Sequence, residues 1–331
     1  PSIMTWCSHN EPFTFNVTPG QSFDIKKMAI PFLAGHQLPT WNKSVLDRWV
    51  KRSFEKADVT RPVIAHSGVL PHLPTLDGTD SHLYFGWYHG DERDLPGFAA
   101  KIPRLMRFVS EFGAQAIPES SEFIDSSAWP VLDWENLENK FGMQRGNFEN
   151  HVPVAEFDSF DDWRLATQVY QADVIRYHIE TLRRLKYRPT GGFCVFALND
   201  AMPMISWSVL DHQRVPKLGY TALAEACRPV IVTADRLPLS IRPGDQLRIA
   251  LHVVSDLHRE LENATVTATV ESIGDPQVWK FEGAIAADDC TLVGHIMITA
   301  PFAEGPVVLD LTLVSGDVVA TNRYQTVVIA N

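Results

Sequence analysis

The first two-thirds of the chain alternates short apolar runs with stretches whose apolar residues recur at helical spacing. This alternation indicates βα units and a parallel sheet. The apolar runs predict five strands, at residues 2–7, 61–66, 81–88, 107–110 and 191–196. Each run leads into a polar or glycine-bearing loop. Because the carboxyl ends of parallel strands meet at one edge, the residues just after these runs are candidates for chemistry.

Helical spacing of apolar residues predicts three helices in the same part of the chain. The first covers residues 45–54. The second is long: Ser159 and Asp162 form a capping-box pattern at its start, and Pro189 marks its end. The third covers residues 220–226. Residues 119–157 lack this spacing, so we expect them to be irregular.

Beyond Pro229 the pattern changes to period-two alternation. Apolar side chains recur at every second position, as in Leu247, Ile249, Leu251 and Val253. This pattern is typical of antiparallel strands with one buried face. We therefore expect two domains. The first is an α/β domain of residues 1–232, and the second, residues 233–331, is an all-β sandwich that resembles an immunoglobulin fold.

Composition narrows the function. The chain has 331 residues, of which 45% are hydrophobic and 21% charged, as in globular proteins. A net charge of -11 and a pI near 5.5 leave no basic face for nucleic acid. No apolar run reaches the roughly 20 residues of a membrane span. The cysteines have no metal-binding spacing and predict reduced, buried thiols and a cytoplasmic location: Cys7, Cys194, Cys227 and Cys290.

Two glutamates stand directly after predicted strands. Glu11 follows the first in Trp6-Cys-Ser-His-Asn-Glu-Pro12, and Glu111 follows the fourth in Arg107-Phe-Val-Ser-Glu-Phe-Gly-Ala-Gln115. One acid in such a position is usually a solvated loop residue, but two at one sheet edge favour paired chemistry. Retaining glycoside hydrolysis needs two carboxyl groups about 5 to 5.5 Å apart, one a proton donor and the other a nucleophile.

These two segments resemble the acid/base and nucleophile motifs of glycoside hydrolase family 2. Between them, Gly86-Trp-Tyr-His-Gly90 is similar to the Gly-x-Trp-His-Gly segment of the β-mannosidase branch, with Tyr88 at a tryptophan position. The last-strand pattern of the family is matched by Phe196-Ala-Leu-Asn-Asp200, Ser206-Trp-Ser208, Asp211 and Lys217-Leu-Gly-Tyr220. The resemblance covers residues 1–230 in register. It implies a TIM (β/α)8 barrel of which this chain holds strands four to eight.

The resemblance also implies residue roles. Glu11 is the expected general acid/base, Glu111 the expected nucleophile, and Asn10 the expected donor to the sugar 2-hydroxyl. Glu111 must then be ionised and Glu11 protonated when the substrate binds. The other expected sugar-binding residues, for which barrel packing is the alternative use, are Trp87, Tyr88, His89, Phe196 and Asn199. Phe196 stands where the family usually has tryptophan, which leaves the sugar preference open. The mechanism needs no metal and no cofactor.

The expected function is that of an exo-acting β-glycosidase with a carbohydrate substrate, most similar to β-mannosidase. β-Galactosidase or β-glucuronidase activity is the alternative within the family. A non-catalytic carbohydrate-binding protein is the alternative outside it. The resemblance further implies that barrel strands one to three precede residue 1. We therefore expect a fragment that is inactive alone and whose open barrel edges bind the missing N-terminal half or a second copy.

Overall fold

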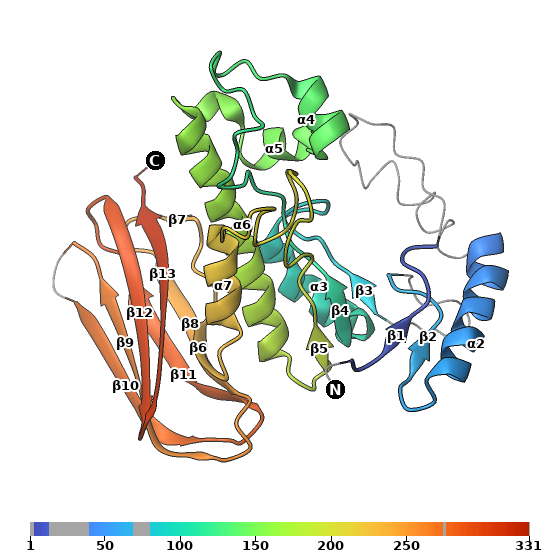
Figure 1. The fold of residues 1–331 in the computed structure, drawn as a ribbon. Coiled ribbons are helices and arrows are strands. Elements are labelled where there is room, and N and C mark those ends of the chain that lie inside the picture. Colours follow the sequence, from blue (N-terminus) through green and yellow to red (C-terminus); the bar gives the residue numbers. More distant parts are fainter. Residues whose placement is uncertain (1–2, 13–39, 69–79, 274–275, 331) are drawn as a thin grey trace. The chain divides into compact units, whose positions relative to one another are not determined.

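The computed structural model describes residues 3–12, 40–68, 80–273 and 276–330 of a mixed α/β protein (Figure 1). The chain forms two compact units. The first comprises Pro1–Leu182 and Arg188–Ala224, and the second Arg183–Tyr187 and Glu225–Asn331. The domain boundary expected after residue 232 falls within β6 (Val230–Ala234), a strand of the second unit. In the part of the chain described here, no helix is both long and apolar enough to cross a membrane.

The strands of the first unit follow the predicted order, and their pairings are parallel. β1 (Trp6–Cys7) pairs with β2 (Val63–Ile64). β4 (Phe108–Glu111) pairs with β3 (Ser81–His82) and with β5 (Gly192–Phe193). Among the described residues no pairing joins β2 to β3, so the strands form two small sheets rather than the single sheet expected. Side chains connect these sheets, because Ser67, after β2, donates a hydrogen bond to Asp80, before β3.

The predicted helices are confirmed. A π-helical turn, η1 (Asn42–Leu46), leads into α2 (Asp47–Ala57), and the others are α6 (Phe160–Arg184) and α7 (Leu218–Ala226). The capping pattern before α6 is present in part, because the Ser159 side chain caps the helix start but the Asp162 carboxylate binds the Ser159 hydroxyl rather than its backbone N–H. The Ser159 hydroxyl donates to Asp162 at 2.6 Å and accepts from the Asp162 backbone N–H at 3.2 Å. Between β3 and β4 lie η2 (Glu92–Asp94), α3 (Leu95–Lys101) and η3 (Pro103–Met106).

Residues 119–157 are not irregular throughout, contrary to expectation. They contain α4 (Trp134–Phe141), α5 (Arg145–His151) and η4 (Val154–Glu156). The side chain of Asp133 caps the start of α4 by accepting from the Asn136 N–H at 3.1 Å. Gly142 ends α4 with a φ of 74°. These helices are too short to show apolar periodicity, so their cap residues are the better signal.

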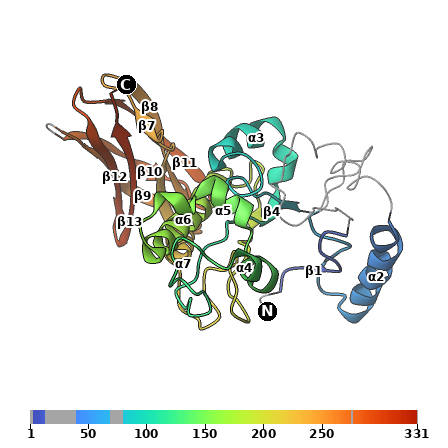
Figure 2. The ribbon, with the colours of Figure 1, turned by 90° about the horizontal axis from the view of Figure 1, so that it is seen from above.

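α6 runs through the core of the first unit. Trp163 and Val174 on this helix are completely buried, within one cluster that also contains Phe148 from α5. Figure 2 shows α7 beside α6. The approach is close, because a Cβ atom added to Gly219 of α7 would lie 2.6 Å from Oε1 of Gln171 on α6. A larger residue at this position would therefore require the Gln171 side chain to move where the two helices meet.

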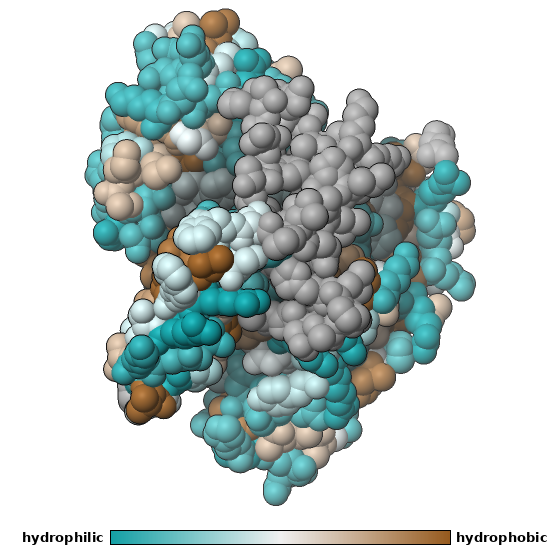
Figure 3. Space-filling model, turned by 90° about the vertical axis from the view of Figure 1, so that its right-hand side faces the viewer, coloured by the Kyte–Doolittle hydropathy of each residue, from teal (hydrophilic) through white to brown (hydrophobic). Residues whose placement is uncertain are grey.

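The buried positions of η1 and α2 differ from those that the apolar spacing suggests. Lys43 and Asp47 are buried, whereas Leu46 and Trp49 are exposed. The Trp49 ring meets that of Trp41 edge-on, with 6.1 Å between centroids, and both are more than half exposed. On the face shown in Figure 3, hydrophobic residues are interspersed with hydrophilic ones. The expected open barrel edges and a partner for them stay predictions.

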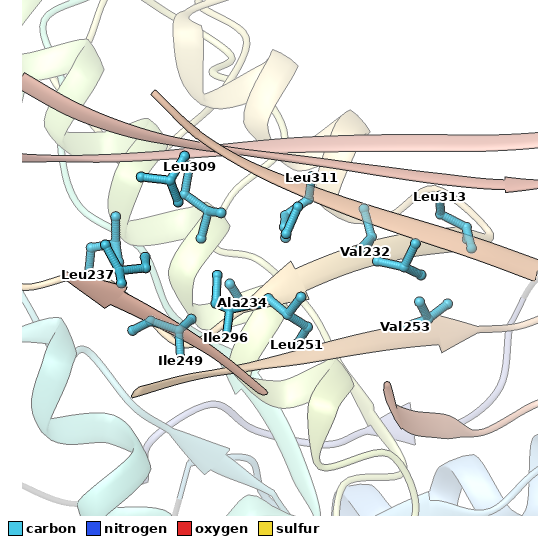
Figure 4. Close-up of a cluster of buried hydrophobic side chains, with 14 of the residues drawn as sticks. Val232, Ala234, Leu237, Ile249, Leu251, Val253, Ile296, Leu309, Leu311 and Leu313 are labelled. Carbon is cyan, nitrogen blue, oxygen red and sulfur yellow. The ribbon is translucent and has the colours of Figure 1, made fainter. Parts of the chain in front are cut away.

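The second unit consists of two β-sheets around one apolar core (Figure 4). The larger sheet has the strand order β10-β9-β12-β13-β7, and the smaller has β11-β8-β6. Among the pairings described in the second unit, only that of β13 with β7 is parallel. The period-two prediction is confirmed, since Leu251 of one sheet and Leu309 and Leu311 of the other are buried in one cluster. The remaining strands are β7 (Ser240–Ile241), β8 (Gln246–Ser255), β9 (Leu261–Glu271), β10 (Gln277–Ile285), β11 (Cys290–Thr299), β12 (Gly305–Ser315) and β13 (Val318–Val328).

None of the four cysteines is buried, so the prediction of buried thiols is wrong. Cys7, Cys194 and Cys227 are exposed, and Cys290 is partly exposed. Successive side chains of an extended segment point to opposite sides. An apolar run such as the one around Cys194 therefore does not require each of its members to be buried.

Candidate active site

The carboxyl ends of β1, β3 and β4 bring together Glu11, His82 and Glu111. Nδ1 of His82 lies 2.6 Å from Oε1 of Glu11 and 3.4 Å from Oε2 of Glu111. One carboxylate oxygen of each glutamate and the histidine nitrogen all lie within 4.8 Å of one another. The two acids, which are 100 positions apart in the sequence, therefore meet at the same nitrogen of one imidazole ring.

Backbone pairing explains this convergence. His82 and Glu111 are direct partners in the register of β3 and β4, and the Leu83 N–H donates to the Glu111 carbonyl at 2.9 Å. The Glu11 N–H donates to the carbonyl of Ser67, after β2, at 3.1 Å. Glu11 itself has a φ of 44°, a left-handed conformation that is uncommon for a residue with a side chain.

Glu111 is surrounded by groups that act on its charge in opposite directions. Burial raises the pKa of Glu111, while the His82 charge and a hydrogen bond from Tyr84 lower it, and the net direction is upward. The Tyr84 hydroxyl donates to Oε2 of Glu111 at 2.7 Å. Burial, followed by the charge of Glu111, also raises the pKa of Tyr84, so the phenol keeps its proton for this bond. Tyr84 therefore favours the ionised form of Glu111.

The predicted sugar-binding residues fall into two groups. Asn10 is exposed next to Glu11, and Phe196 and Asn199 are exposed after β5. Tyr88 and His89 are partly buried, and Trp87 is only 2% exposed. The indole N–H of Trp87 donates to Oε1 of Gln144 at 2.8 Å. This placement favours core packing for Trp87, the alternative considered from the sequence, over contact with a sugar.

Trp207 is an aromatic residue near Glu11 and Glu111. The sequence indicated no role for it beyond its place in the Ser206-Trp-Ser208 segment. Its ring centroid lies 6.4 Å from that of Tyr84, 6.3 Å from Tyr88 and 5.6 Å from Phe196. Its buried indole N–H has no hydrogen-bond partner among the described residues. Tyr84 links this aromatic group to the acids through its hydrogen bond to Glu111.

The residues that resemble the family's last-strand pattern form a buried polar network behind Trp207. The hydroxyls of Ser206 and Ser208 each donate to Oδ1 of Asp200 at 2.7 Å. The Lys217 ammonium group donates to the Ser206 carbonyl at 3.3 Å. Burial, partly offset by nearby carboxylates, lowers the pKa of Lys217 to about 8. The network holds the segment between Asp200 and Ser208, and thereby Trp207, in place.

A metal ion could use the donor atoms of Glu11, His82 and Glu111, since they lie within 4.8 Å of one another. The three groups already interact with one another directly: the His82–Glu11 contact is a hydrogen bond of 2.6 Å. The chemistry expected of paired glutamates also needs no metal. The absence of a metal and of any other cofactor stays a prediction.

Sequence comparison identifies relatives with a stated activity. No protein-family model matches the chain. Beta-mannosidase B of Thermothelomyces thermophilus is 26% identical over 292 residues, which are 80% of this chain and 32% of that protein. Beta-mannosidase B of Aspergillus flavus is 30% identical over 254 residues, 71% of this chain and 29% of that protein. The chain thus spans about a third of the length of the curated relatives it matches.

Solved structures share the fold. A beta-D-mannosidase from Dictyoglomus thermophilum superposes with a TM-score of 0.66 at 18% identity, covering 98% of this chain and 38% of that one. The exo-chitosanase of Amycolatopsis orientalis superposes with a TM-score of 0.62 at 15% identity, covering 85% and 34%. The fold and the curated relatives place this chain among the relatives of glycoside hydrolases. Within that class its resemblance to glycoside hydrolase family 2 is confirmed, and the curated relatives reported above are named beta-mannosidase B.

Substituting Tyr84 by phenylalanine tests the environment of Glu111. The hydrogen bond from Tyr84 lowers the pKa of Glu111, so its loss raises that pKa further. If Glu111 must be ionised to react, Tyr84→Phe in the full-length protein moves the acidic limb of the pH profile to higher pH. The profile is that of kcat/KM for glycoside hydrolysis. We also expect kcat/KM to fall about tenfold, the order of one lost hydrogen bond to a charged group. The matched control is Tyr220→Phe, at an exposed tyrosine; an unshifted acidic limb in Tyr84→Phe would contradict the role given to Tyr84.

Proposed function

We propose that this chain carries the catalytic pair of a retaining exo-β-glycosidase that acts on β-mannosides. The observation that carries the proposal is the spacing of the acids. One carboxylate oxygen of Glu11 and one of Glu111 lie within 4.8 Å of each other. Retaining enzymes place their carboxyl groups about 5 to 5.5 Å apart, whereas inverting enzymes need about 6.5 to 9.5 Å to admit a water molecule.

In the proposed mechanism the reaction proceeds by double displacement. Glu111 attacks the anomeric carbon while Glu11 protonates the leaving oxygen, which gives a covalent glycosyl ester on Glu111. Glu11 then accepts a proton from water as the water oxygen attacks the same carbon, and Glu111 is released as a carboxylate. Tyr84 supports the nucleophile, because its hydroxyl stabilises the negative charge from which the attack starts. Asn10, exposed beside Glu11, is the proposed donor to the sugar 2-hydroxyl.

The architecture we propose is that of strands four to eight of a TIM barrel, followed by an immunoglobulin-like sandwich. The parallel pairings β1–β2, β3–β4 and β4–β5 support the first part, and the two sheets around one core support the second. The relatives are about three times as long as the matched region. We therefore propose that activity belongs to the whole protein and that residues 1–331 alone are inactive. A cytoplasmic location is also proposed, from the free thiols of Cys7, Cys194 and Cys227.

The mannoside preference rests on the curated names of the relatives. β-Galactosidase and β-glucuronidase activity are the alternatives within the family, and carbohydrate binding without turnover is the alternative outside it. A second acid placed this close to the first has no evident use in a binding protein, which favours an enzyme.

A panel of nitrophenyl β-glycosides tests the proposal on the full-length protein. We expect the β-mannoside to be hydrolysed with the highest kcat/KM among mannoside, galactoside, glucuronide and glucosaminide. Proton NMR of the first-formed sugar should show the β-anomer, because two displacements retain the configuration. Release of the α-anomer would reject the retaining mechanism. Turnover of none of the four sugars would reject the proposed β-glycosidase activity on these sugar classes.

A further inference from the structure

Gln144 stands directly before α5, and neither the motifs nor the proposed mechanism gives it a role. It occupies the cap position of that helix, where Ser, Thr, Asp or Asn usually supplies the capping oxygen. Among the described residues, its side chain makes no capping bond. The side-chain amide instead contacts Trp87 and Tyr88, which follow β3, and Asn147. The side chain of Gln144 is therefore used outside the helix that it precedes.

The indole of Trp87 fixes the direction of the bonds that Gln144 makes. An indole N–H can only donate, so the Gln144 atom that it contacts at 2.8 Å is the amide oxygen. The same oxygen accepts from the amide nitrogen of Asn147 at 3.0 Å. The amide nitrogen of Gln144 is thereby turned to the hydroxyl oxygen of Tyr88, to which it donates. Tyr88 is the acceptor in this bond.

The backbone of Gln144 is also held by a side chain. Its N–H donates to Oε1 of Gln115 at 2.8 Å. Gln115 is 1% exposed, and its amide nitrogen donates to the carbonyls of Gly142 at 2.9 Å and Ile205 at 3.0 Å. Gln115 lies in the segment that directly follows Glu111. One buried amide thus connects the segment of the proposed nucleophile to Gln144.

Tyr88 lies close enough to Glu111 for the charge of that carboxylate to act on its hydroxyl. The rings of Tyr88 and Tyr84 are 5.1 Å apart between centroids, and the Tyr84 hydroxyl donates to Glu111. Burial raises the pKa of Tyr88 to about 12; the bond from Gln144 opposes this rise, and the charge of Glu111 adds to it. The phenol therefore keeps its proton at neutral pH.

A protonated phenol that accepts one hydrogen bond has a defined donor direction. The lone pair that faces Gln144 is occupied, so the O–H hydrogen of Tyr88 points away from that amide. An amide of the opposite orientation would accept this hydrogen and hold it outside the sugar site. The observed orientation directs the hydrogen to another acceptor, and a sugar hydroxyl oxygen is an acceptor of this kind.

We propose that Gln144 is a positioning residue: by donating to the Tyr88 oxygen, it makes Tyr88 a hydrogen-bond donor to one hydroxyl of the bound sugar. The proposal deepens the proposed function and rests on it. Its basis is the bond from the Trp87 indole, which sets the amide orientation, and the contact of Tyr88 with Tyr84 beside Glu111. A fixed donor of this kind discriminates against sugars that lack the matching hydroxyl.

Deoxy substrates test the proposal in the full-length protein. The substrates are 4-nitrophenyl β-mannoside and its 3-, 4- and 6-deoxy analogues. Removing the hydroxyl that Tyr88 binds should lower kcat/KM in wild-type protein, and this loss should shrink about tenfold in Tyr88→Phe, which lacks the donor. The loss at the same hydroxyl should shrink likewise in Gln144→Glu, because a carboxylate accepts the Tyr88 hydrogen and draws it away. Any other outcome, including a change in Tyr88→Phe alone, would overturn the proposal.

A double variant separates positioning of Tyr88 from support of the fold. Gln144→Glu keeps an oxygen that accepts from Trp87 and Asn147. We expect it to lower kcat/KM on the parent mannoside about tenfold in wild-type protein but less than about twofold in Tyr88→Phe. Equal reductions in the two backgrounds would mean that Gln144 only supports the fold, and the proposal would fail. The matched control is Gln325→Glu, at an exposed glutamine of β13, which should leave kcat/KM unchanged.

Two further comparisons keep the result interpretable. Thermal unfolding checks that each variant folds. If Gln144→Glu does not, Gln144→Met replaces it, because methionine also removes the donor to Tyr88 and should weaken the same hydroxyl preference. Hydrolysis by wild-type protein without coupling between Gln144 and Tyr88 would reject this inference and leave the proposed function intact. Failure of wild-type protein to hydrolyse any aryl glycoside would reject the proposed function and this inference with it.

Discussion

Replacing Glu111 by glutamine should reduce turnover by the full-length protein to below about one per cent, because the proposed mechanism forms the glycosyl ester on the Glu111 carboxylate. Glutamine keeps the shape of the side chain and an oxygen that can accept the Tyr84 hydrogen bond. An amide oxygen is nevertheless a poor nucleophile, so the first displacement fails. The measurement is kcat/KM on 4-nitrophenyl β-mannoside, alongside thermal unfolding to establish that the fold is retained.

The matched control for this substitution is Glu135→Gln, at an exposed glutamate of α4. Removing a charge there should change neither kcat/KM nor Tm by more than the error of measurement. If Glu111→Gln retained more than a few per cent of wild-type activity, Glu111 would not be the nucleophile. Because the substitution also removes a buried charge that faces His82, a modest change of Tm is compatible with the assignment.

The fold was predictable wherever the hydrophobic pattern extends over many residues. Period-two alternation located the strands of the second unit, since their side chains point alternately into one core and out of it, as Leu309 and Leu311 do. The long helix α6 was evident from its capping box at Ser159 and Asp162. The short helices α4 and α5 were not, because seven or eight residues hold too few apolar positions to define a face.

Burial was less predictable than secondary structure in η1 and α2. Their apolar residues recur at helical spacing, yet the buried positions are Lys43 of η1 and Asp47 of α2. The reason is a specific pairing: Oδ1 of Asp47 lies 2.7 Å from Nδ1 of His9, which follows β1. The contact between a buried carboxylate and its histidine partner decides which positions are buried. That contact cannot be predicted from the spacing of apolar residues.

The candidate site was predictable in its acids but not in its support. Glu11 and Glu111 stand at strand ends within recognisable motifs. No motif pointed to His82, because its proximity to Glu111 comes from the register of β3 and β4. In retrospect, Asp80 and His82 are polar residues at the start of an otherwise apolar strand, a pattern that needed a reason. Trp87 lies in a family-like segment, and its place in the buried core cluster favours packing, the alternative weighed from the sequence.

Replacing Glu11 by alanine should separate the two half-reactions. Without a general acid, substrates with poor leaving groups lose about 10²- to 10⁴-fold in rate, whereas 2,4-dinitrophenyl β-mannoside still forms the ester on Glu111. Hydrolysis of that ester is then slow, because no base activates water. The ester should accumulate, giving a burst of dinitrophenol followed by a low steady rate.

Azide should restore turnover in this variant. Alanine leaves a space where the carboxylate of Glu11 stood, and that carboxylate is more than a third exposed, so a small anion can enter. Azide needs no base and attacks the anomeric carbon directly, so the steady rate should rise with azide concentration and the product should be β-mannosyl azide. Wild-type protein and Glu111→Gln provide the comparison, since azide should accelerate neither. An α-azide from Glu11→Ala would mean that azide displaced the aryl group directly, as expected if Glu11 rather than Glu111 were the nucleophile. The anomer of the azide product therefore decides which of the two acids holds which role.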